Sequence, residues 1–394
     1  MDRRRFLVGS AAALVSSQVG LANASDKLRV AVIGHTGRGN FGHGLDTVWM
    51  RLPETQIVAV ADANADGLNS AKKRLKTEQG FEDYRVMLKK VEPDVVAVCP
   101  RHPDQHRDMI VASIEAGAKG IYVEKPFCRT PAEADQIIAE AEKRNAKVAI
   151  AHRNRYHPTL KAIDKLIADG ELGRVLEIRG RGKGDRRGGG EDLWVLGSHT
   201  LNLMNYFGGK PQSCSAVMKQ NGRRVTKADV KEGNEALGAL AGNEIHARYE
   251  MERGFTAYFD SIANDDTRNH GFGLQVIGSR GIVSLKCDRH PLAHFVPGNP
   301  FEPTDKPRPW IPISTAGIGK PEPRDDLVEM VSHHGAPAHD LIQSIGTDRQ
   351  PLCSAYEGAT VLEMICGVFE SHRQDSRAVT LPLTERENAL TKLD

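Results

Sequence analysis

The sequence predicts an α/β fold class: an N-terminal parallel sheet with helices on both faces, followed by an α+β domain with a mostly antiparallel open sheet. The chain has 394 residues, more than the roughly 250–300 residues at which a single hydrophobic core usually stops growing. Short apolar runs alternate with amphipathic segments from residue 27 onward, and this alternation stops after residue 155. We therefore expect two domains, at 27–152 and 153–385, with the C-terminal helix and strand packing back towards the first.

The first half contains continuous apolar runs, which a strand buried on both faces of a parallel sheet requires. They lie at 28–34, 57–62, 94–99, 120–123 and 147–150. The segments between them are long enough for helices, which we expect at 41–50, 66–76, 103–116 and 131–144. Strands that alternate with helices in this way predict a parallel sheet covered on both sides.

The second half has longer strand-like runs and fewer helices. Strands are expected at 174–183, 244–251, 255–262, 272–277, 282–285 and 378–381, and helices at 159–168, 338–345 and 356–372. The glycine-containing turn at 278–281 is typical of a β-hairpin. Residues 290–326 are dense in proline, and we expect them to form an ordered loop excursion rather than a linker.

The composition excludes several classes of protein. Lys and Arg number 53 against 51 Asp and Glu, a formal net charge of +2, which argues against a nucleic-acid binder. Hydrophobic residues make up 40% and charged residues 26%, which excludes a disordered chain. The six Cys are too sparse for a disulfide scaffold and lack the CxxC spacing of a zinc site. Because helix-spaced pairs such as HExxH are also missing, we expect no metal.

Residues 1–24 have the three-part layout of an export signal. A basic cluster precedes a weakly apolar stretch, and Ala-Asn-Ala at 22–24 matches an A-x-A cleavage site. The run Arg-Arg-Arg-Phe-Leu at 3–7 resembles a twin-arginine (Tat) signal. We expect export by the Tat machinery to the periplasm or another extracytoplasmic space, and an uncleaved anchoring N-terminus is the alternative. Loss of this leader would leave equal numbers of basic and acidic side chains.

A glycine-rich loop directly follows the first apolar run, with the sequence Gly34-His35-Thr36-Gly37-Arg38-Gly39. Glycines here allow a tight turn and a close approach to a pyrophosphate, and the following helix would offer its free amides. The next buried run ends at Asp62, where a carboxylate would bind both ribose hydroxyls and repel a 2′-phosphate. The pattern predicts a Rossmann domain that prefers NAD, although Arg38 keeps NADP open. The alternative is a glycine turn and a capping Asp in a cofactor-free domain.

A series of further motifs points to a family. It comprises His106, AGAKGIYVEKP at 116–126, Arg-Tyr-His-Pro at 155–158, Gly-Glu-Leu-Gly at 170–173, and His199 within LGSHTLNLM. In this order, and with the nucleotide fold upstream, the series resembles the glucose–fructose oxidoreductase/inositol dehydrogenase/rhizopine-catabolism (Gfo/Idh/MocA) family. The resemblance covers nearly the whole chain after the leader.

The resemblance implies an NAD(P)-dependent oxidoreductase that acts on a sugar, polyol or sugar derivative, with an open sheet that suits a homo-oligomer. In the family pattern, Lys125 lies beside the nicotinamide and the reacting carbinol, and His199 moves the hydroxyl proton. Oxidising an alcohol does need a proton acceptor and an electropositive group beside the developing alkoxide. The cofactor is expected to contact the loop 34–39 together with Asp62, Cys99, Pro100, His106, Glu124, Lys125 and Pro126. The substrate is expected to contact Arg155, Tyr156, Glu191, Asp192 and His199.

The chain departs from the family pattern beside its histidine. Many members have an Asp four residues before the histidine and another three residues after it, whereas this chain has Val195 and Asn202. A valine cannot stabilise the charge of an imidazolium, so we expect Glu191 and Asp192 to compensate. The alternative is that these two carboxylates only offset basic neighbours.

Three basic residues alternate along one predicted strand: Arg179, Arg181 and Lys183. Their period of two would place them on one face of the sheet. The pattern favours a solvated or interface face over a surface for an anionic substrate.

Export and a dinucleotide cofactor together suggest a tightly held NAD, because free NAD is scarce outside the cytoplasm and the Tat route carries folded cargo. The expected function is therefore an oxidoreductase that recycles its NAD within each turnover. One alternative is an NAD-dependent glycoside hydrolase, which oxidises one carbon transiently, eliminates the glycoside and reduces the ring again. The other is a non-catalytic relative that binds a nucleotide or a sugar.

Overall fold

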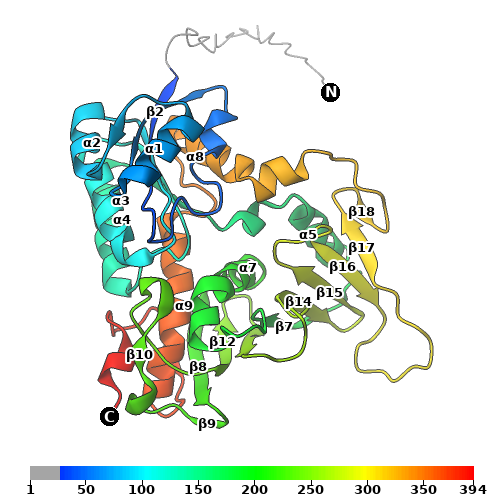
Figure 1. The fold of residues 1–394 in the computed structure, drawn as a ribbon. Helices are drawn as coiled ribbons and strands as arrows, with labels where there is room; N and C mark the ends of the chain where they lie inside the picture. The colour runs from blue at the N-terminus through cyan, green and yellow to red at the C-terminus, as the bar shows by residue number, and fades with distance from the viewer. Residues whose placement is uncertain (1–26) are drawn as a thin grey trace, which may run out of the picture.

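The computed structural model describes residues 27–394, and the expected leader lies outside these described residues. The N-terminal domain is a six-stranded, all-parallel sheet in the order β3-β2-β1-β4-β5-β6 (Figure 1). Its strands are β1 (Leu28–Ile33), β2 (Thr55–Ala61), β3 (Gly80–Phe81), β4 (Val95–Val98), β5 (Gly120–Val123) and β6 (Lys147–Ile150). Its helices are α1 (Ala65–Leu75), α2 (Tyr84–Val91), α3 (His106–Glu115) and α4 (Pro131–Arg144). The predicted parallel domain is confirmed.

Local signals explain where these elements begin and end. All four residues of β4, β5 and β6 are buried, as the apolar runs require. Helix α4 begins after Thr130, whose side chain accepts a hydrogen bond from the backbone of Glu133, with Pro131 at the first helical position. It ends at Asn145, which adopts the left-handed conformation of a helix C-terminus.

The helix predicted at 41–50 is wrong. The segment forms successive turns and one short 3₁₀ helix, η1 (Val48–Met50). Asn40, Gly42 and Gly44 have φ values of 55°, 65° and 98°, which no right-handed helix contains. No helix therefore follows the glycine loop directly, so a bound pyrophosphate would meet the backbone amides of turns instead of the N-terminus of a helix.

The second domain is built on an eleven-stranded sheet in the order β18-β17-β16-β15-β14-β7-β13-β12-β8-β19, with β9 also paired to β8. Every neighbouring pair is antiparallel except β7 with β13, so the predicted mostly antiparallel sheet is confirmed. The strands are β7 (Val175–Arg181), β8 (Pro211–Gln220), β9 (Arg223–Arg224), β12 (Glu244–Met251), β13 (Thr256–Ile262), β14 (Gly273–Gly278), β15 (Gly281–Lys286), β16 (Ala293–Pro297), β17 (Ile311–Ser314), β18 (Gly317–Ile318) and β19 (Val379–Thr380). A separate small sheet pairs β10 (Lys231–Glu232) with β11 (Ala239–Leu240).

Helices cover one face of the large sheet. They are α5 (Thr159–Ala168), α7 (Ser198–Gly208) and α9 (Ala355–Arg373). Helix α8 (Gly335–Thr347) packs against β5 and β6 of the first domain, and the short α6 (Gly190–Asp192) lies within the second domain. Among the described residues, no helix combines the length and the apolar character that crossing a bilayer would need.

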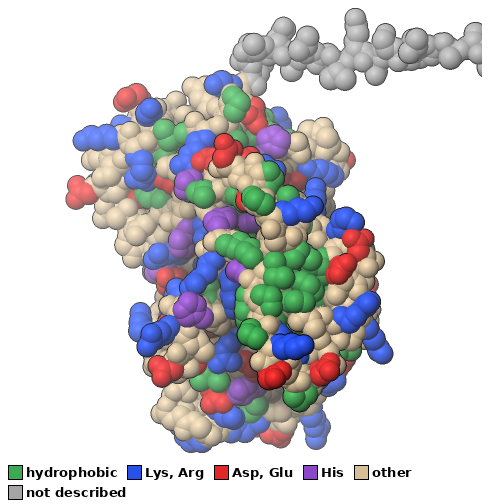
Figure 2. Space-filling model, turned by 90° about the vertical axis from the view of Figure 1, so that its right-hand side faces the viewer, with side chains coloured by type: hydrophobic (Ala, Val, Ile, Leu, Met, Phe, Trp, Pro, Cys, Tyr) green, Lys and Arg blue, Asp and Glu red, His purple; other side chains and the backbone are tan. Residues whose placement is uncertain are grey.

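The proline-dense segment at 290–326 contains three strands, β16 to β18, so the expectation of a loop excursion is wrong for these parts. The strands lie at the end of the sheet, where proline is tolerated because fewer backbone amides have to pair. Figure 2 views the molecule from this side and shows a patch of hydrophobic side chains. Phe301 and Trp310, which lie in the loop between β16 and β17, are 67% and 53% exposed.

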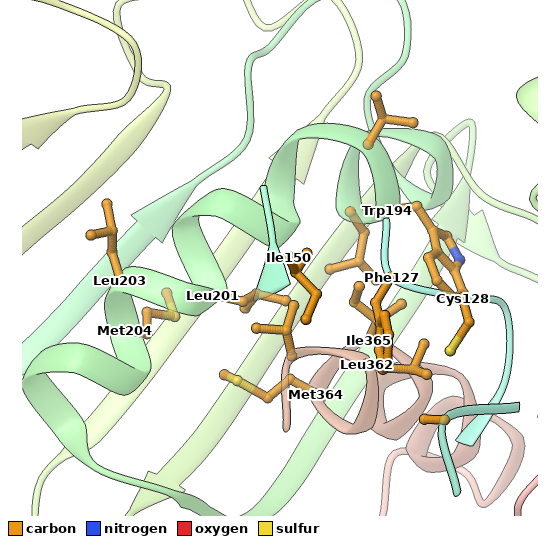
Figure 3. Packing of buried hydrophobic residues seen from close by; sticks show 14 of the residues in the cluster. Phe127, Cys128, Ile150, Trp194, Leu201, Leu203, Met204, Leu362, Met364 and Ile365 are labelled. Carbon is orange, nitrogen blue, oxygen red and sulfur yellow. The ribbon is translucent and has the colours of Figure 1, made fainter. Parts of the chain in front are cut away.

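One continuous core joins the two domains. Helix α9 packs against both α4 and β8, and β19 pairs with β8. Phe127 and Ile150 of the first domain lie against Trp194, Leu362 and Ile365 of the second (Figure 3). This packing fixes the end of β5, and the residues that follow it, relative to the segment that leads into α7.

Candidate active site

A cavity of about 240 Å³ lies between the two domains, beside the carboxyl ends of β4 and β5. Its polar lining consists of His43, Arg101, Glu124, Lys125, Arg153, Lys183, Arg187, His199, Glu235, Asp288 and His334. The structure therefore brings the two predicted catalytic residues, Lys125 and His199, into one cavity. The carboxyl ends of parallel strands are the edge where α/β proteins bind ligands.

Lys125 follows β5 and is 7% exposed. Its ammonium Nζ donates a hydrogen bond of 3.0 Å to the carbonyl oxygen of Val195 in the π-helical turn η4 (Leu193–Gly197). Val195 thus supplies its backbone rather than the missing carboxylate. Among the described residues no acidic side chain pairs with Nζ, so the ammonium can stabilise negative charge on a bound molecule.

Glu124, the neighbour of Lys125, is 1% exposed and holds the backbone at this point. Its Oε2 accepts a 2.6 Å hydrogen bond from the backbone amide of Lys125, and its Oε1 pairs with His43. Burial alone would raise the pKa of Glu124, but the hydrogen bond from His43 and the charge of Lys125 hold it well below its usual range. Glu124 is therefore a charged anchor of the site.

His199 lies in the first turn of α7 and is 5% exposed. Its ring packs edge-on against the buried His152, with ring centroids 5.6 Å apart, and its Nδ1 has no hydrogen-bond partner among the described residues. Burial lowers the pKa of His199 to about 3, and the carboxylate of Asp288 opposes that effect. At neutral pH the imidazole is therefore uncharged and able to accept a proton.

Asp288 is the acidic residue of this site that the sequence did not reveal. It follows β15 and lines the cavity with His199. Its carboxylate accepts hydrogen bonds from Arg153 Nε at 3.0 Å and from Asn154 Nδ2 at 3.1 Å. Burial raises the pKa of Asp288, but the charge of Arg153 and the hydrogen bonds from Arg153 and Asn154 hold it below its usual range. Nothing in the sequence around Asp288 connects it to a histidine on another element.

Glu191 and Asp192, the expected compensating acids, do not line this cavity. Asp192 is fully buried and accepts hydrogen bonds from the backbone of Lys183 and from Ser261 Oγ. Glu191 accepts a 2.7 Å hydrogen bond from Asn234. Both are turned away because the RGGG run that precedes them packs its backbone against residues 241–243 and 263. Neither carboxylate therefore lines the cavity that holds His199, whereas Asp288 does.

Arg155 and Tyr156, expected at the substrate, also lie outside the cavity lining. Arg155 donates a 2.8 Å hydrogen bond to the carbonyl of Asn202, and Tyr156 Oη donates one of 2.8 Å to Asp340. Both residues belong to the 3₁₀ turn η3 (Arg153–Tyr156), and only its first residue reaches the cavity. These two side chains therefore hold α7 and α8 in place rather than facing a substrate.

The glycine loop at 34–39 lies where the strand order reverses, between β1 and β4, which is the crevice that binds nucleotides in doubly wound sheets. Gly37 and Gly39 both have φ of 86°. A Cβ on Gly39 would lie 2.2 Å from the backbone nitrogen of Arg101, whereas a Cβ on Gly37 would meet nothing within 4 Å. The loop thus presents bare backbone to open space, which fits the pyrophosphate of a dinucleotide.

Asp62 lies beneath this loop and is 1% exposed. Its carboxylate accepts hydrogen bonds from the backbone and the hydroxyl of Thr36, the latter at 2.6 Å, and from the backbone of Asn64. It therefore ties the loop to the start of α1. Both carboxylate oxygens of Asp62 are thus hydrogen-bonded within the protein.

The other expected cofactor residues support the crevice from behind or at its rim. His106 is fully buried, and its ring nitrogens lie 2.7 Å from the carbonyl oxygen of Pro100 and 2.9 Å from that of Pro126. Cys99 is also fully buried. At the rim, His35 Nδ1 pairs with Gln105 at 2.7 Å, and Arg38 pairs with Asp104. The sequence thus located the crevice, but several of these side chains shape it without facing it.

We expect His334 to make the protein less stable in mild acid. His334 lines the cavity, is 2% exposed and binds Tyr122 Oη at 2.7 Å, and burial lowers its pKa to about 4. Since the unfolded imidazole has a pKa of about 6.5, the unfolded chain binds the proton first as pH falls from 6.5 towards 4. The His334→Gln variant should therefore lose about 2 kcal/mol less stability than the wild type between pH 7 and pH 5.

Urea unfolding of both proteins at the two pH values measures this difference. The neighbouring His333, whose side chain is 49% exposed, provides the matched control, and His333→Gln should follow the wild type. Equal pH dependence in His334→Gln and the wild type would contradict the assignment of a neutral buried imidazole.

Comparison with known proteins agrees with this geometry. Residues 28–152 match the sequence model described as "Oxidoreductase family, NAD-binding Rossmann fold", and residues 164–381 match "Oxidoreductase family, C-terminal alpha/beta domain". Among solved structures, levoglucosan dehydrogenase in complex with NADH and levoglucosan is similar, with a TM-score of 0.69 and 20% identity over 91% of this chain and 100% of that one. At this identity the likeness shows the fold.

Curated relatives are similar over part of their length. A levoglucosan dehydrogenase of Pseudarthrobacter phenanthrenivorans is 23% identical over 60% of this chain and 66% of its own. An inositol 2-dehydrogenase of Salmonella paratyphi B is 30% identical over 32% of this chain and 38% of its own. The chain thus spans less than two thirds of the length of either relative. Because the two family matches together cover most of the sequence, the chain belongs to the Gfo/Idh/MocA oxidoreductase family, with an NAD-binding Rossmann fold.

Proposed function

We propose that this protein is an NAD-dependent dehydrogenase of a sugar, a polyol or a sugar derivative. The observation that carries the proposal is the placement of Lys125 and His199 in one cavity beside the crevice of the glycine loop. One is an ammonium without an acidic partner in the described chain, and the other is a buried neutral imidazole. An alcohol oxidation needs this pair of groups. The names of the relatives, levoglucosan dehydrogenase and inositol 2-dehydrogenase, support the substrate class.

The residues around the cavity and the crevice fit the parts of the cofactor. The loop 34–39 would hold the pyrophosphate, and the residues after β5 would border the nicotinamide. NAD, when bound, supplies the acceptor for the hydride of the carbinol carbon. The protein supplies the proton chemistry, in which His199 takes the hydroxyl proton and Lys125 donates a hydrogen bond to the developing alkoxide oxygen. Asp288 then stabilises the imidazolium that forms.

We also propose that the protein is exported through its Tat-type leader at 1–24 and carries its NAD with it. The leader's twin arginines and cleavage site support export, and the scarcity of free NAD outside the cytoplasm supports a retained cofactor. A retained cofactor must be reoxidised before the next turnover, so each cycle would end with reduction of a second carbonyl compound in the same site.

The test begins with freshly purified full chain that has not been supplied with nucleotide. We expect denaturation to release close to one NAD(H) per chain, measured by nicotinamide absorbance in the supernatant. A panel of sugars and polyols that includes levoglucosan and myo-inositol should then change the absorbance of the bound nicotinamide. If the purified protein contains no nucleotide but forms NADH from added NAD, the proposed dehydrogenase function holds and the proposal of a retained cofactor is overturned. Absence of both signals would overturn the proposed function.

A further inference from the structure

Lys183 lies just beyond the end of β7 and lines the active-site cavity. Its environment differs from that of Arg179 and Arg181, the two basic residues that precede it at alternate positions. Arg179 pairs with Glu177 and Arg181 pairs with Asp265, both at ion-pair distance. The array predicted from the sequence is therefore divided: two members are paired with acids of the second domain, and the third points into the cavity.

The turn that carries Lys183 can only be built with its two flanking glycines. A Cβ on Gly182 would lie 1.7 Å from the carboxylate oxygen Oδ2 of Asp192. Gly184 has φ of 73°, and a Cβ there would lie 2.2 Å from Oδ1 of Asp265. A side chain at either position would collide with a carboxylate and displace the backbone of Lys183.

Buried polar groups hold this turn in place. The backbone amide of Lys183 donates to both oxygens of Asp192, at 3.1 and 3.3 Å, and Asp192 is fully buried. Ser261 donates to Oδ2 of Asp192 at 2.5 Å and accepts a hydrogen bond from the backbone of Gly189 at 3.0 Å. Burial of a carboxylate is costly, and burial raises the pKa of Asp192. The structure uses this buried carboxylate to fix the backbone of one lysine.

The ammonium of Lys183 differs from the arginines around the cavity because, like Lys125, it has no acidic partner among the described residues. Arg153 pairs with Asp288 at 3.0 Å and Arg101 with Glu235 at 3.6 Å. Arg187 gives its Nε and Nη2 to Asp185, which leaves Nη1 without a hydrogen-bond partner within residues 27–394. The Lys183 ammonium thus faces the cavity from a fixed backbone turn, and Nη1 of Arg187 is available beside it to donate a hydrogen bond.

Resting on the proposed function, we propose that Lys183 and Arg187 bind a carboxylate of the substrate, so that the enzyme acts on sugar or polyol acids in preference to neutral sugars. A carboxylate would give the ammonium an ion pair in addition to a hydrogen bond, whereas a neutral hydroxyl would give it the hydrogen bond alone. Because the backbone of the turn is fixed before binding, only the side chains have to be ordered when the contact forms. The carboxylate end would lie away from Lys125, and a hydroxyl-bearing carbon of the same molecule would face the reacting groups.

Calorimetric titration of the NAD-loaded enzyme with paired probes tests this inference. The pairs are D-glucose with D-glucuronate and D-galactose with D-galacturonate, and D-glucose 6-phosphate distinguishes a phosphate from a carboxylate. We expect at least one acid to bind about tenfold or more tightly than its neutral partner. Lys183→Met should weaken the binding of that acid by about 10- to 100-fold, which at 1.4 kcal/mol per tenfold is about 1.4 to 2.8 kcal/mol. The acid-to-neutral ratio should then approach one.

Lys161→Met, which removes an exposed lysine of α5 outside the cavity, is the matched control and should keep the wild-type ratio. Lys183→Gln retains hydrogen bonding without the charge and should behave like Lys183→Met. Acids that bind no tighter than their neutral partners in both pairs, tighter binding of the phosphate alone, or an unchanged ratio in both Lys183 variants would overturn the inference. NADH formation from a neutral sugar in such an outcome would leave the proposed dehydrogenase function standing.

Discussion

Replacing Lys125 with Met should lower kcat about 1000-fold while the protein keeps its NAD, because the charged donor beside the alkoxide is lost and the glycine loop that would hold the pyrophosphate is untouched. The hydrogen bond from Nζ to the backbone of Val195 shows that the ammonium lies between the two domains, where a substrate would enter. Steady-state rates with the most active sugar of the panel, together with released nicotinamide per chain, measure the two quantities separately. Loss of the nucleotide together with the activity would point to a structural role instead.

Lys147 provides the matched control for this variant. It is also buried, at 4% exposed, but it lies on β6 and pairs with Asp348 outside the cavity. Lys147→Met should lower stability and leave kcat within a few fold of the wild type. If the protein were a binding relative without catalysis, Lys125→Met would retain its measurable sugar or nucleotide binding, and no substrate would ever change the nicotinamide absorbance.

Much of the first domain was predictable because β4, β5 and β6 are buried at every residue, so these strands are almost wholly apolar. Helix α4 and strand β6 have the bounds that the sequence predicted, at 131–144 and 147–150. The helix predicted at 41–50 failed because Asn40, Gly42 and Gly44 adopt left-handed conformations, and composition alone does not show which residues will do so.

The second domain was harder to predict because its sheet has one open face. Strand β8 alternates buried and accessible residues over Pro211–Gln220, a weak signal that the sequence analysis did not assign to a strand. The strands β16 to β18 at one end of the sheet lie among prolines, which normally argue against a strand. Long-range register in an antiparallel sheet therefore had to come from the structure.

The same limit applies to the site. Lys125 and His199 could be located because their motifs are short and local, whereas Asp288 reaches the cavity only through the fold of β14 and β15. Glu191 and Asp192 were expected to act because they are near His199 in sequence. Asp192 instead lies under the Gly-Lys-Gly turn, a placement that depends on Ser261 and on the glycines around it.

Asp288→Asn should lower kcat/KM by about 100-fold or more, because it removes the negative charge that favours a protonated His199. Burial already lowers the pKa of His199 to about 3, and Asp288 is the largest opposing influence. Without that charge the pKa of His199 falls further, so the imidazole becomes a weaker proton acceptor. Raising the pH from 7 to 9 should not restore activity, since His199 is neutral at both values and what is lost is stabilisation of the imidazolium formed during the reaction.

The substitution is conservative in shape, because asparagine retains the side-chain oxygen that accepts from Arg153 and Asn154 and tolerates the left-handed backbone at this position, where φ is 58°. Asp229→Asn is the matched control, since Asp229 also pairs with an arginine, Arg223, but lies outside the cavity. Measuring kcat/KM against pH for the wild type and both variants tests this prediction. A variant at position 288 with wild-type kcat/KM would show that His199 works without an acidic partner, and the valine at 195 would then mark a site that needs none.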